Sequence, residues 1–237
     1  MNSDFTAFLK GWLPYALGAL LVVQFAGLGV WQVSRALEKQ ADRRAWDEQA
    51  GFRPFADGMA VRPYQKLAAE GRYDGAHQLL LDNIILESRY GHYVLTPLVL
   101  DGQAPALIVN RGWIERGANG VGAEALAVPD ARLAVHGRVG SLPKAGYRMA
   151  AAFGERDGWP RHAVYPTLDE VAAELGRQVQ PFVLLMDPAE EHGLVRHWTP
   201  EEMGPARHYA YALQWFAMGA VLAALLVWNY RKRGLES

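Results

Sequence analysis

A histidine and four aromatic or apolar side chains recur at spacings of three and four residues near the C-terminus. They are His208, Tyr211, Trp215, Met218 and Leu222. Because residues three and four apart share one face of an α-helix, this pattern predicts a helix that presents one imidazole among aromatic rings. An imidazole can ligate haem iron, and aromatic side chains can flank the haem ring. A second interpretation stays open, since Trp and Tyr also gather at membrane–water interfaces.

A second set of side chains follows the same helical spacing near the N-terminus, and consists of Gln24, Gly27 or Leu28, Trp31 and Arg35. We expect the two faces to pack together, with Gly27 permitting close approach. Gln24 lies in the middle of an apolar run, so its amide should face protein or a ligand, and a hydrogen bond between helices would satisfy it. Arg35 and Arg207 could bind haem propionates, because guanidinium groups pair with carboxylates in a bidentate fork.

Both sets lie on apolar runs that have the length of membrane-spanning helices. The runs cover residues 13–33 and 208–230, and an α-helix needs ~20 residues to cross the hydrocarbon core. The first run is too long for a signal-peptide core and no small-x-small cleavage site follows it, so we expect a retained anchor. The predicted division is an N-terminal segment 1–12, helices 13–33 and 208–230, a soluble domain 34–207 and a basic tail 231–237.

Basic residues at the ends of the two runs indicate the orientation in the membrane. Arg231, Lys232 and Arg233 directly follow the second run, which favours a cytoplasmic C-terminus. Two spans then place the N-terminus in the cytoplasm as well. Residues 35–44 after the first run also contain four basic side chains, which taken alone favour the reverse orientation. Those four are interleaved with acidic residues, so we give the C-terminal cluster more weight.

The region between the two runs is predicted to be rich in antiparallel β-structure, an α+β domain that could form a small barrel. Its expected strands are Tyr64–Tyr73, Gln78–Asp82, His92–Leu100, Ala106–Trp113, Leu133–Val139 and Gln180–Met186. Asp101-Gly102 indicates a hairpin, and Thr167 with Glu170 indicates a capped helix up to Gly176. Residues 118–128 and 146–159 are expected to be loops. The first helix should continue past the membrane as an amphipathic helix and end before Gly51 and Pro54.

Composition and missing motifs exclude several function classes. The chain has 24 basic and 25 acidic side chains and a formal net charge of -1, which does not suit nucleic-acid binding. It has no cysteine, so disulfides, thiolate metal sites and covalent c-type haem are excluded. It lacks a P-loop, a dinucleotide glycine fingerprint and a nucleophile elbow, so we predict a protein that is not an enzyme. His77, His92, His136 and His162 are interpreted as surface or core residues. His192 and His197 are five residues apart and lack an acidic partner set, which disfavours a metal site.

Three sequence blocks together resemble the surfeit-locus (Surf/Shy-type) family of cytochrome oxidase assembly factors. The first is Gly29-Val30-Trp31-Gln32-Val33-Ser34-Arg35, followed by Lys39; the second is Asn110-Arg111-Gly112-Trp113-Ile114, preceded by Gly91-His92-Tyr93-Val94-Leu95-Thr96-Pro97; the third is His208-x-x-Tyr211-Ala212-x-x-Trp215-Phe216. Their order and the two-span frame also match, so the resemblance covers almost the whole chain. The sequence departs from the family at Glu115, where a proline is common.

This resemblance implies a role in the maturation of haem–copper terminal oxidases. It implies a bacterial cytoplasmic-membrane protein with a periplasmic central domain, transient binding of haem a with His208 as iron ligand, and the oxidase large subunit and haem a synthase as partners. The alternative is a scaffold that holds an assembly intermediate without touching haem. For the second block, two interpretations stay open: a turn with a core aromatic, or Trp113 facing the membrane while Arg111 reaches for a propionate.

Overall fold

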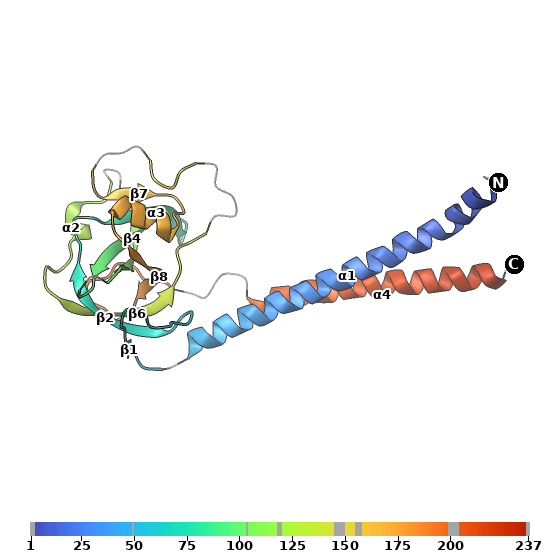
Figure 1. The fold of residues 1–237 in the computed structure, drawn as a ribbon, viewed down its shortest axis with the longest axis horizontal. Helices are drawn as coiled ribbons and strands as arrows, with labels where there is room; N and C mark the ends of the chain where they lie inside the picture. The colour runs from blue at the N-terminus through green and yellow to red at the C-terminus, as the bar shows by residue number, and fades with distance from the viewer. Residues whose placement is uncertain are drawn as a thin grey trace. The chain divides into compact units, whose positions relative to one another are not determined.

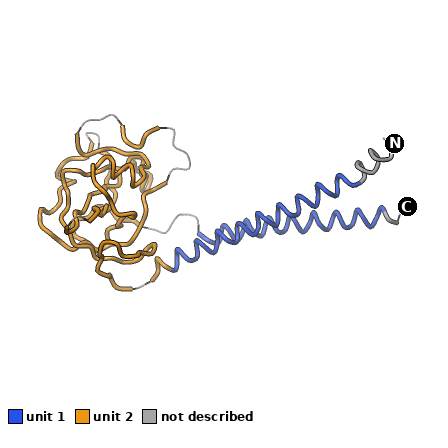
Figure 2. Tube along the Cα trace, viewed as in Figure 1, with its two compact units in different colours: residues 1–44, 200–237 blue, residues 45–199 orange. Residues whose placement is uncertain are grey.

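The structure is a computed structural model of the chain. It describes residues 3–48, 50–102, 104–117, 120–144, 150–154, 158–198 and 204–235, of which residues 3–11 and 234–235 are described by their backbone alone. The chain divides into two compact units (Figure 2): residues 1–44 with 200–237, and residues 45–199. Each unit is described by itself.

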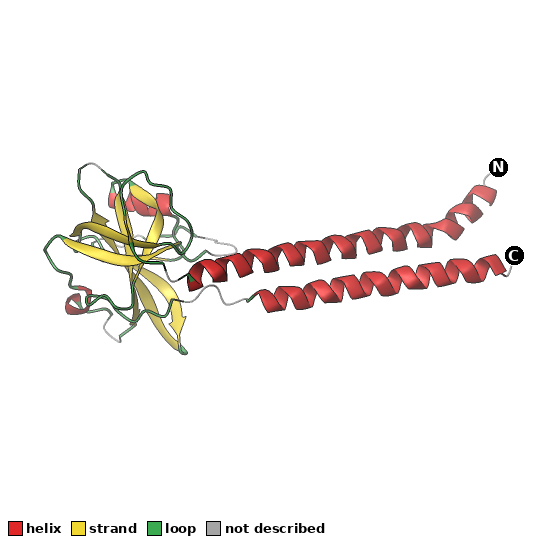
Figure 3. Cartoon of the chain, turned by 90° about the horizontal axis from the view of Figure 1, so that it is seen from below, coloured by secondary structure: helices red, strands yellow, loops and turns green. Residues whose placement is uncertain are grey.

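The first unit is a pair of long helices that lie side by side and run in opposite directions (Figure 1, Figure 3). Helix α1 comprises Ser3–Asp47 and helix α4 comprises Pro205–Leu235. Each contains a stretch long and apolar enough to cross a membrane, with a mean hydropathy of 1.8. Helix α1 ends before Gly51 and Pro54, which confirms that the first apolar run continues as one helix into polar sequence.

In its described residues, the second unit contains eight strands. They are β1 (Arg53–Pro54), β2 (Lys66–Tyr73), β3 (Leu79–Leu86), β4 (Arg89–Val99), β5 (Ala106–Glu115), β6 (Leu133–Gly140), β7 (Arg161–Ala163) and β8 (Val179–Met186). Five of them close a barrel in the order β2-β6-β8-β5-β4, because β4 also pairs with β2. The predicted fold class is thereby confirmed. The sheet is mixed rather than purely antiparallel, since β5 and β8 run parallel.

Most predicted elements of this domain are present, and the differences concern short ones. The six expected strands correspond to β2, β3, β4, β5, β6 and β8. Helix α3 (Leu168–Leu175) has the predicted capping box, in which the Thr167 hydroxyl accepts a hydrogen bond from the Glu170 amide. Strands β1 and β7 were not predicted, and helix α2 (Ala123–Leu126) lies within a region expected to be a loop. The predicted loop 146–159 falls partly outside the described residues.

Strand β5 forms the centre of the hydrophobic core. Its residues from Ala106 to Trp113 are all buried, so the strand is covered on both faces. Leu107 and Val109 point into the barrel with the other interior side chains, whereas Ile108 packs in a second cluster that includes Val171 of α3. Alternate residues of a strand point to opposite faces, which explains why one strand serves two clusters. The second sequence block therefore begins in the most buried strand of the domain.

Candidate functional site

Small residues bring α1 and α4 into close contact. A Cβ atom added at Gly29 would lie 2.6 Å from the Phe216 ring, and one added at Gly18 would lie 2.7 Å from the Leu226 side chain. Close packing of this kind is the usual way in which membrane helices associate. The prediction that Gly27 permits this approach is wrong, because nothing lies within 4 Å of a Cβ atom there. α1 packs against α4 through the face that contains Gly18 and Gly29, and Gly27 lies on a different face.

His208 is oriented by a hydrogen bond across the helix pair. Its Nδ1 lies 2.8 Å from Oε1 of Gln32, and its side chain is half-buried. Because an amide oxygen only accepts hydrogen bonds, Nδ1 is the donor in this contact, and Nε2 is the ring nitrogen left to bind a metal. In metal sites, histidine ligands are commonly oriented by such a hydrogen bond from the ring nitrogen that does not touch the metal. Trp215, on the same face of α4, packs against Phe25 of α1 with ring centroids 5.6 Å apart.

The other side chains predicted for this site lie on the outside of the helix pair. Tyr211 is 49% exposed and Trp31 is 53% exposed. Arg207 is exposed, and Arg35 is exposed and pairs with Glu38 at 2.6 Å. The structure therefore brings His208 together with Gln32, keeps Trp215 on the same face of α4, and leaves the side chains of Tyr211, Trp31, Arg35 and Arg207 exposed.

Gln24, Gly27, Trp31 and Arg35 form an exposed stripe on α1, on nearly the opposite side from Gly29 and Gln32. The expected packing of this stripe against α4 is not found, because α1 uses its small-residue face instead. Among the described residues, none forms a hydrogen bond with the Gln24 side chain. On the same helix, the motif residue Lys39 lies 3.9 Å from the Asp42 carboxylate.

Arg111 of the second block is a buried hub of the β domain. Its side chain donates to the backbone oxygens of Leu126, Ala127 and His192 at 2.9–3.2 Å, and to the Gln78 amide oxygen at 3.2 Å. Arg111 is 2% exposed, and its burial lowers the pKa of the guanidinium. One interpretation has Arg111 reaching for a haem propionate. In the structure its guanidinium instead holds loops to the barrel.

The neighbouring motif residues have structural contacts as well. Gly112 has a φ of 124°, and its backbone amide donates a hydrogen bond to Oδ1 of Asn110 at 3.1 Å. Trp113 is 2% exposed, and its indole donates to the Ile84 oxygen at 3.1 Å. A Cβ atom at Gly91 would lie 2.4 Å from that indole. These contacts favour the interpretation of the block as a turn with a core aromatic.

The match to known families agrees with this geometry. A family model described as the SURF1 family matches residues 19–220, a range that includes Gln32, His208 and the whole barrel. The chain belongs to the SURF1 family. SURF1 proteins are associated with cytochrome oxidase assembly and are not known as enzymes. A search of curated proteins found no match.

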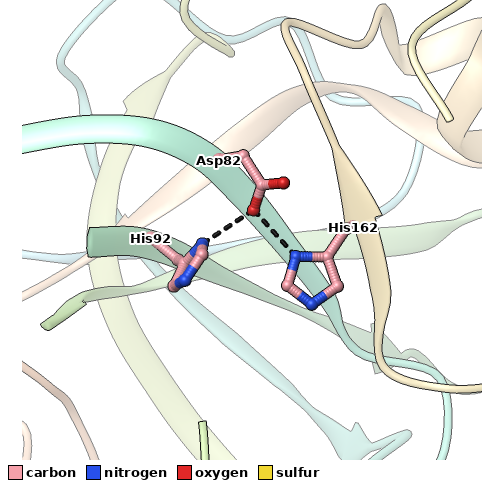
Figure 4. Close-up of side chains that lie close together, drawn as sticks. All are labelled: Asp82, His92 and His162. Carbon is pink, nitrogen blue, oxygen red and sulfur yellow. Dashed lines mark hydrogen bonds and ion pairs between the residues drawn. The ribbon is translucent and has the colours of Figure 1, made fainter. Parts of the chain in front are cut away.

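The SURF1 region of this chain also contains a cluster that the sequence interpretation missed. Asp82, His92 and His162 lie together on β3, β4 and β7 (Figure 4). The two histidines were interpreted as separate surface or core residues, because they are 70 positions apart (162 minus 92). Only the strand pairings bring them together, since β3 lies between β4 and β7. β7 is only three residues long, so it shows no strand pattern in the sequence that would place His162 near His92.

Proposed function

We propose that this protein assists the assembly of a haem–copper terminal oxidase by holding haem a at one end of the helix pair. His208 would ligate the iron through Nε2, Tyr211 and Trp215 would flank the ring, and Arg207 would bind a propionate. Trp31 and Arg35 lie on the exposed stripe of α1, away from Gln32, so we do not assign them to the haem site. The oxidase large subunit would receive the haem, and haem a synthase would supply it. The haem is cargo, so binding has to be reversible.

The observation that best supports this proposal is the bond between His208 and Gln32. It orients a half-buried imidazole so that Nε2 can bind iron, next to the exposed ring of Tyr211. A single imidazole ligand also suits a carrier, since a second strong ligand would slow release.

The two apolar helices and the basic tail support a proposed membrane location and orientation. We propose a location in the bacterial cytoplasmic membrane, with both helices spanning it and both termini in the cytoplasm. Arg231, Lys232 and Arg233 support this orientation through the positive-inside rule. The β domain would then face the periplasm, and His208 would lie near the periplasmic boundary of the membrane.

Changing His208 or Gln32 should separate a haem carrier from a protein that does not touch haem. We expect His208→Ala to abolish the Soret band of protein purified from cells that make haem a. Gln32→Leu should weaken haem binding by roughly 10–100-fold, because it removes the group that orients the His208 ring. The measurement is the haem-to-protein ratio after purification, followed by titration with haem.

His197→Ala is the matched control, because His197 is exposed and belongs to the β domain. It should retain the full Soret band. An unchanged band in His208→Ala would contradict the ligand assignment. Circular dichroism of each variant would show that the helices remain folded.

A second function, a membrane scaffold for an assembly intermediate, is favoured by the exposed stripe on α1. An amide in the hydrocarbon region needs a hydrogen-bond partner, and Gln24 has none among the described residues. Gly27 beside it leaves room for another backbone. A helix of an oxidase subunit with a polar side chain at mid-membrane would satisfy both features.

Substitutions on this stripe test the scaffold function. We expect Gln24→Leu combined with Gly27→Leu to reduce co-purification of oxidase subunits several-fold while haem binding by the isolated protein is retained. Leu213→Ile is the control, because Leu213 is 71% exposed and lies on α4, not on the stripe. If the double variant captures oxidase subunits as well as the unchanged chain does, the stripe is not a docking face.

A further inference from the structure

We propose that Asp82, His92 and His162 form a binding site for a divalent transition-metal ion of the Zn²⁺ type. The site lies in the β domain and is independent of the haem proposal. It rests on the convergence of three ligand-bearing side chains from three different strands (Figure 4).

The three side chains already point at a common position. Nδ1 of His92 lies 2.7 Å and Nδ1 of His162 lies 2.8 Å from the same oxygen, Oδ1 of Asp82. The two imidazole rings are nearly perpendicular, at 81°, with centroids 5.4 Å apart. All candidate ligand atoms lie within 4.8 Å of one another. A tetrahedral ion bound at ~2.0–2.2 Å from each atom needs ligand separations of roughly 3.3–3.6 Å, which lie between the hydrogen-bond distances and the 4.8 Å limit.

The backbone of β3 is shaped to aim Asp82 at this position. The pairing of β3 with β4 shifts register between Leu81 and Ile84, which marks a β-bulge at Asp82 and Asn83. Asn83 has a φ of 63°, in the left-handed region that non-glycine residues rarely adopt. Bulges commonly redirect a side chain near a functional site. The bulge places the Asp82 carboxylate between His92 on β4 and His162 on β7.

The donor set selects the class of ion. Two imidazoles and one carboxylate suit Zn²⁺ and neighbouring transition ions, whereas Mg²⁺ and Ca²⁺ prefer oxygen ligands alone. On binding, each imidazole would carry its proton on Nε2, and the ion would replace the two protons now shared with Asp82. Burial lowers the pKa of His92 below its ordinary value.

The site combines one fixed ligand with two accessible ones. The side chain of His92 is 6% exposed, whereas those of Asp82 and His162 are 27% and 31% exposed. An ion can therefore enter from solvent, and water can complete a four-coordinate shell. The positive charge of Arg116 acts on His92 and opposes cation binding, so we expect moderate rather than very tight affinity.

A bound ion would fasten β7 to the barrel. β7 is three residues long and pairs only with β3 among the named strands of the described structure. Ligation through His162 would join it to both β3 and β4. Zn²⁺ should therefore raise the unfolding midpoint of the domain, since a ligand that binds only the folded state stabilises it.

The test is Zn²⁺ titration of the full chain, purified in detergent and stripped of metal, against a chromophoric chelator. We expect one equivalent of Zn²⁺ to bind, with a rise in the thermal unfolding midpoint. Asp82→Asn and His162→Gln should each weaken Zn²⁺ binding by about tenfold or more. Losing a metal ligand should lower the affinity at least as much as losing a residue that only orients a ligand. At the same Zn²⁺ concentration, the rise in unfolding midpoint should be smaller in each variant than in the unchanged chain.

His136→Gln is the matched control, because His136 also contacts a carboxylate, that of Glu190, at 2.7 Å but lacks a second histidine. It should bind Zn²⁺ as the unchanged chain does. Pulsed EPR of the Cu²⁺-loaded full chain gives a reading that does not depend on the variants folding, and two coordinated imidazoles are expected. Absence of Zn²⁺ binding, equal binding by His162→Gln, or fewer than two imidazoles would overturn the site.

Discussion

Replacing Gly112 by alanine should lower the free energy of unfolding of the β domain by about 2–5 kcal/mol. Two costs combine: a φ of 124° strains any residue with a side chain, and the new methyl group would lie 2.7 Å from the backbone oxygen of Val195. Val195 cannot move aside without breaking its hydrogen bond with the Trp113 amide, which is 2.7 Å long. Urea unfolding of the detergent-purified chain, followed by circular dichroism, measures the change.

Gly51→Ala is the comparison for this prediction. Gly51 also belongs to the second unit, but a Cβ atom there meets nothing within 4 Å and its φ is not positive. Its unfolding midpoint should change little. Equal midpoints for the two variants would show that the backbone at Gly112 relaxes freely, and would remove the structural explanation for glycine in this motif.

Replacing Arg111 by methionine should destabilise the β domain by about 3–5 kcal/mol, the usual cost of removing one partner from a buried charged network. Methionine would fill much of the space but leave the oxygens of Leu126, Ala127 and His192 without their donors. Arg111→Lys should recover only part of the loss, because an ammonium group cannot span the planar arrangement of acceptors. Urea unfolding and limited proteolysis near residue 126 would measure these effects.

Arg72→Met is the control for Arg111. Arg72 donates to the backbone oxygen of Asp130 at 2.6 Å, but its side chain is 58% exposed. Solvent can replace its hydrogen bonds, so we expect a change of less than about 1 kcal/mol. If Arg111→Met were as mild, the buried hub would contribute little to holding the loops of α2 and His192 in place.

The elements of the fold were predictable where local pattern and tertiary structure agree. The capping box of Thr167 and Glu170, and the hairpin at Asp101-Gly102, depend on neighbouring residues alone and are present. Strand β7 was missed because its three residues show no alternation, and its pairing with β3 spans about 80 positions. The parallel pairing of β5 with β8 was missed for the same reason, since strand direction depends on topology rather than on composition.

The candidate site was predictable only in part, for a related reason. Helical spacing identified His208 and Trp215, which do face α1. Spacing could not decide which of two stripes on α1 faces them, because both contain a glycine. The structure selects Gly29, whose contact with the Phe216 ring depends on the relative rotation of the helices. The cluster of Asp82, His92 and His162 depends on strand register, which a single sequence does not reveal.

The position of β8 in the barrel has a consequence for synthesis of the protein. β8 is the last strand to leave the ribosome, yet it lies between β5 and β6 and pairs with both. Until residues 179–186 emerge, those two strands have open edges, and open edges invite pairing with other chains. The barrel therefore closes late in synthesis, through contacts between residues far apart in the sequence. A nonsense codon anywhere before β8 should yield an aggregating fragment and not a shorter folded domain.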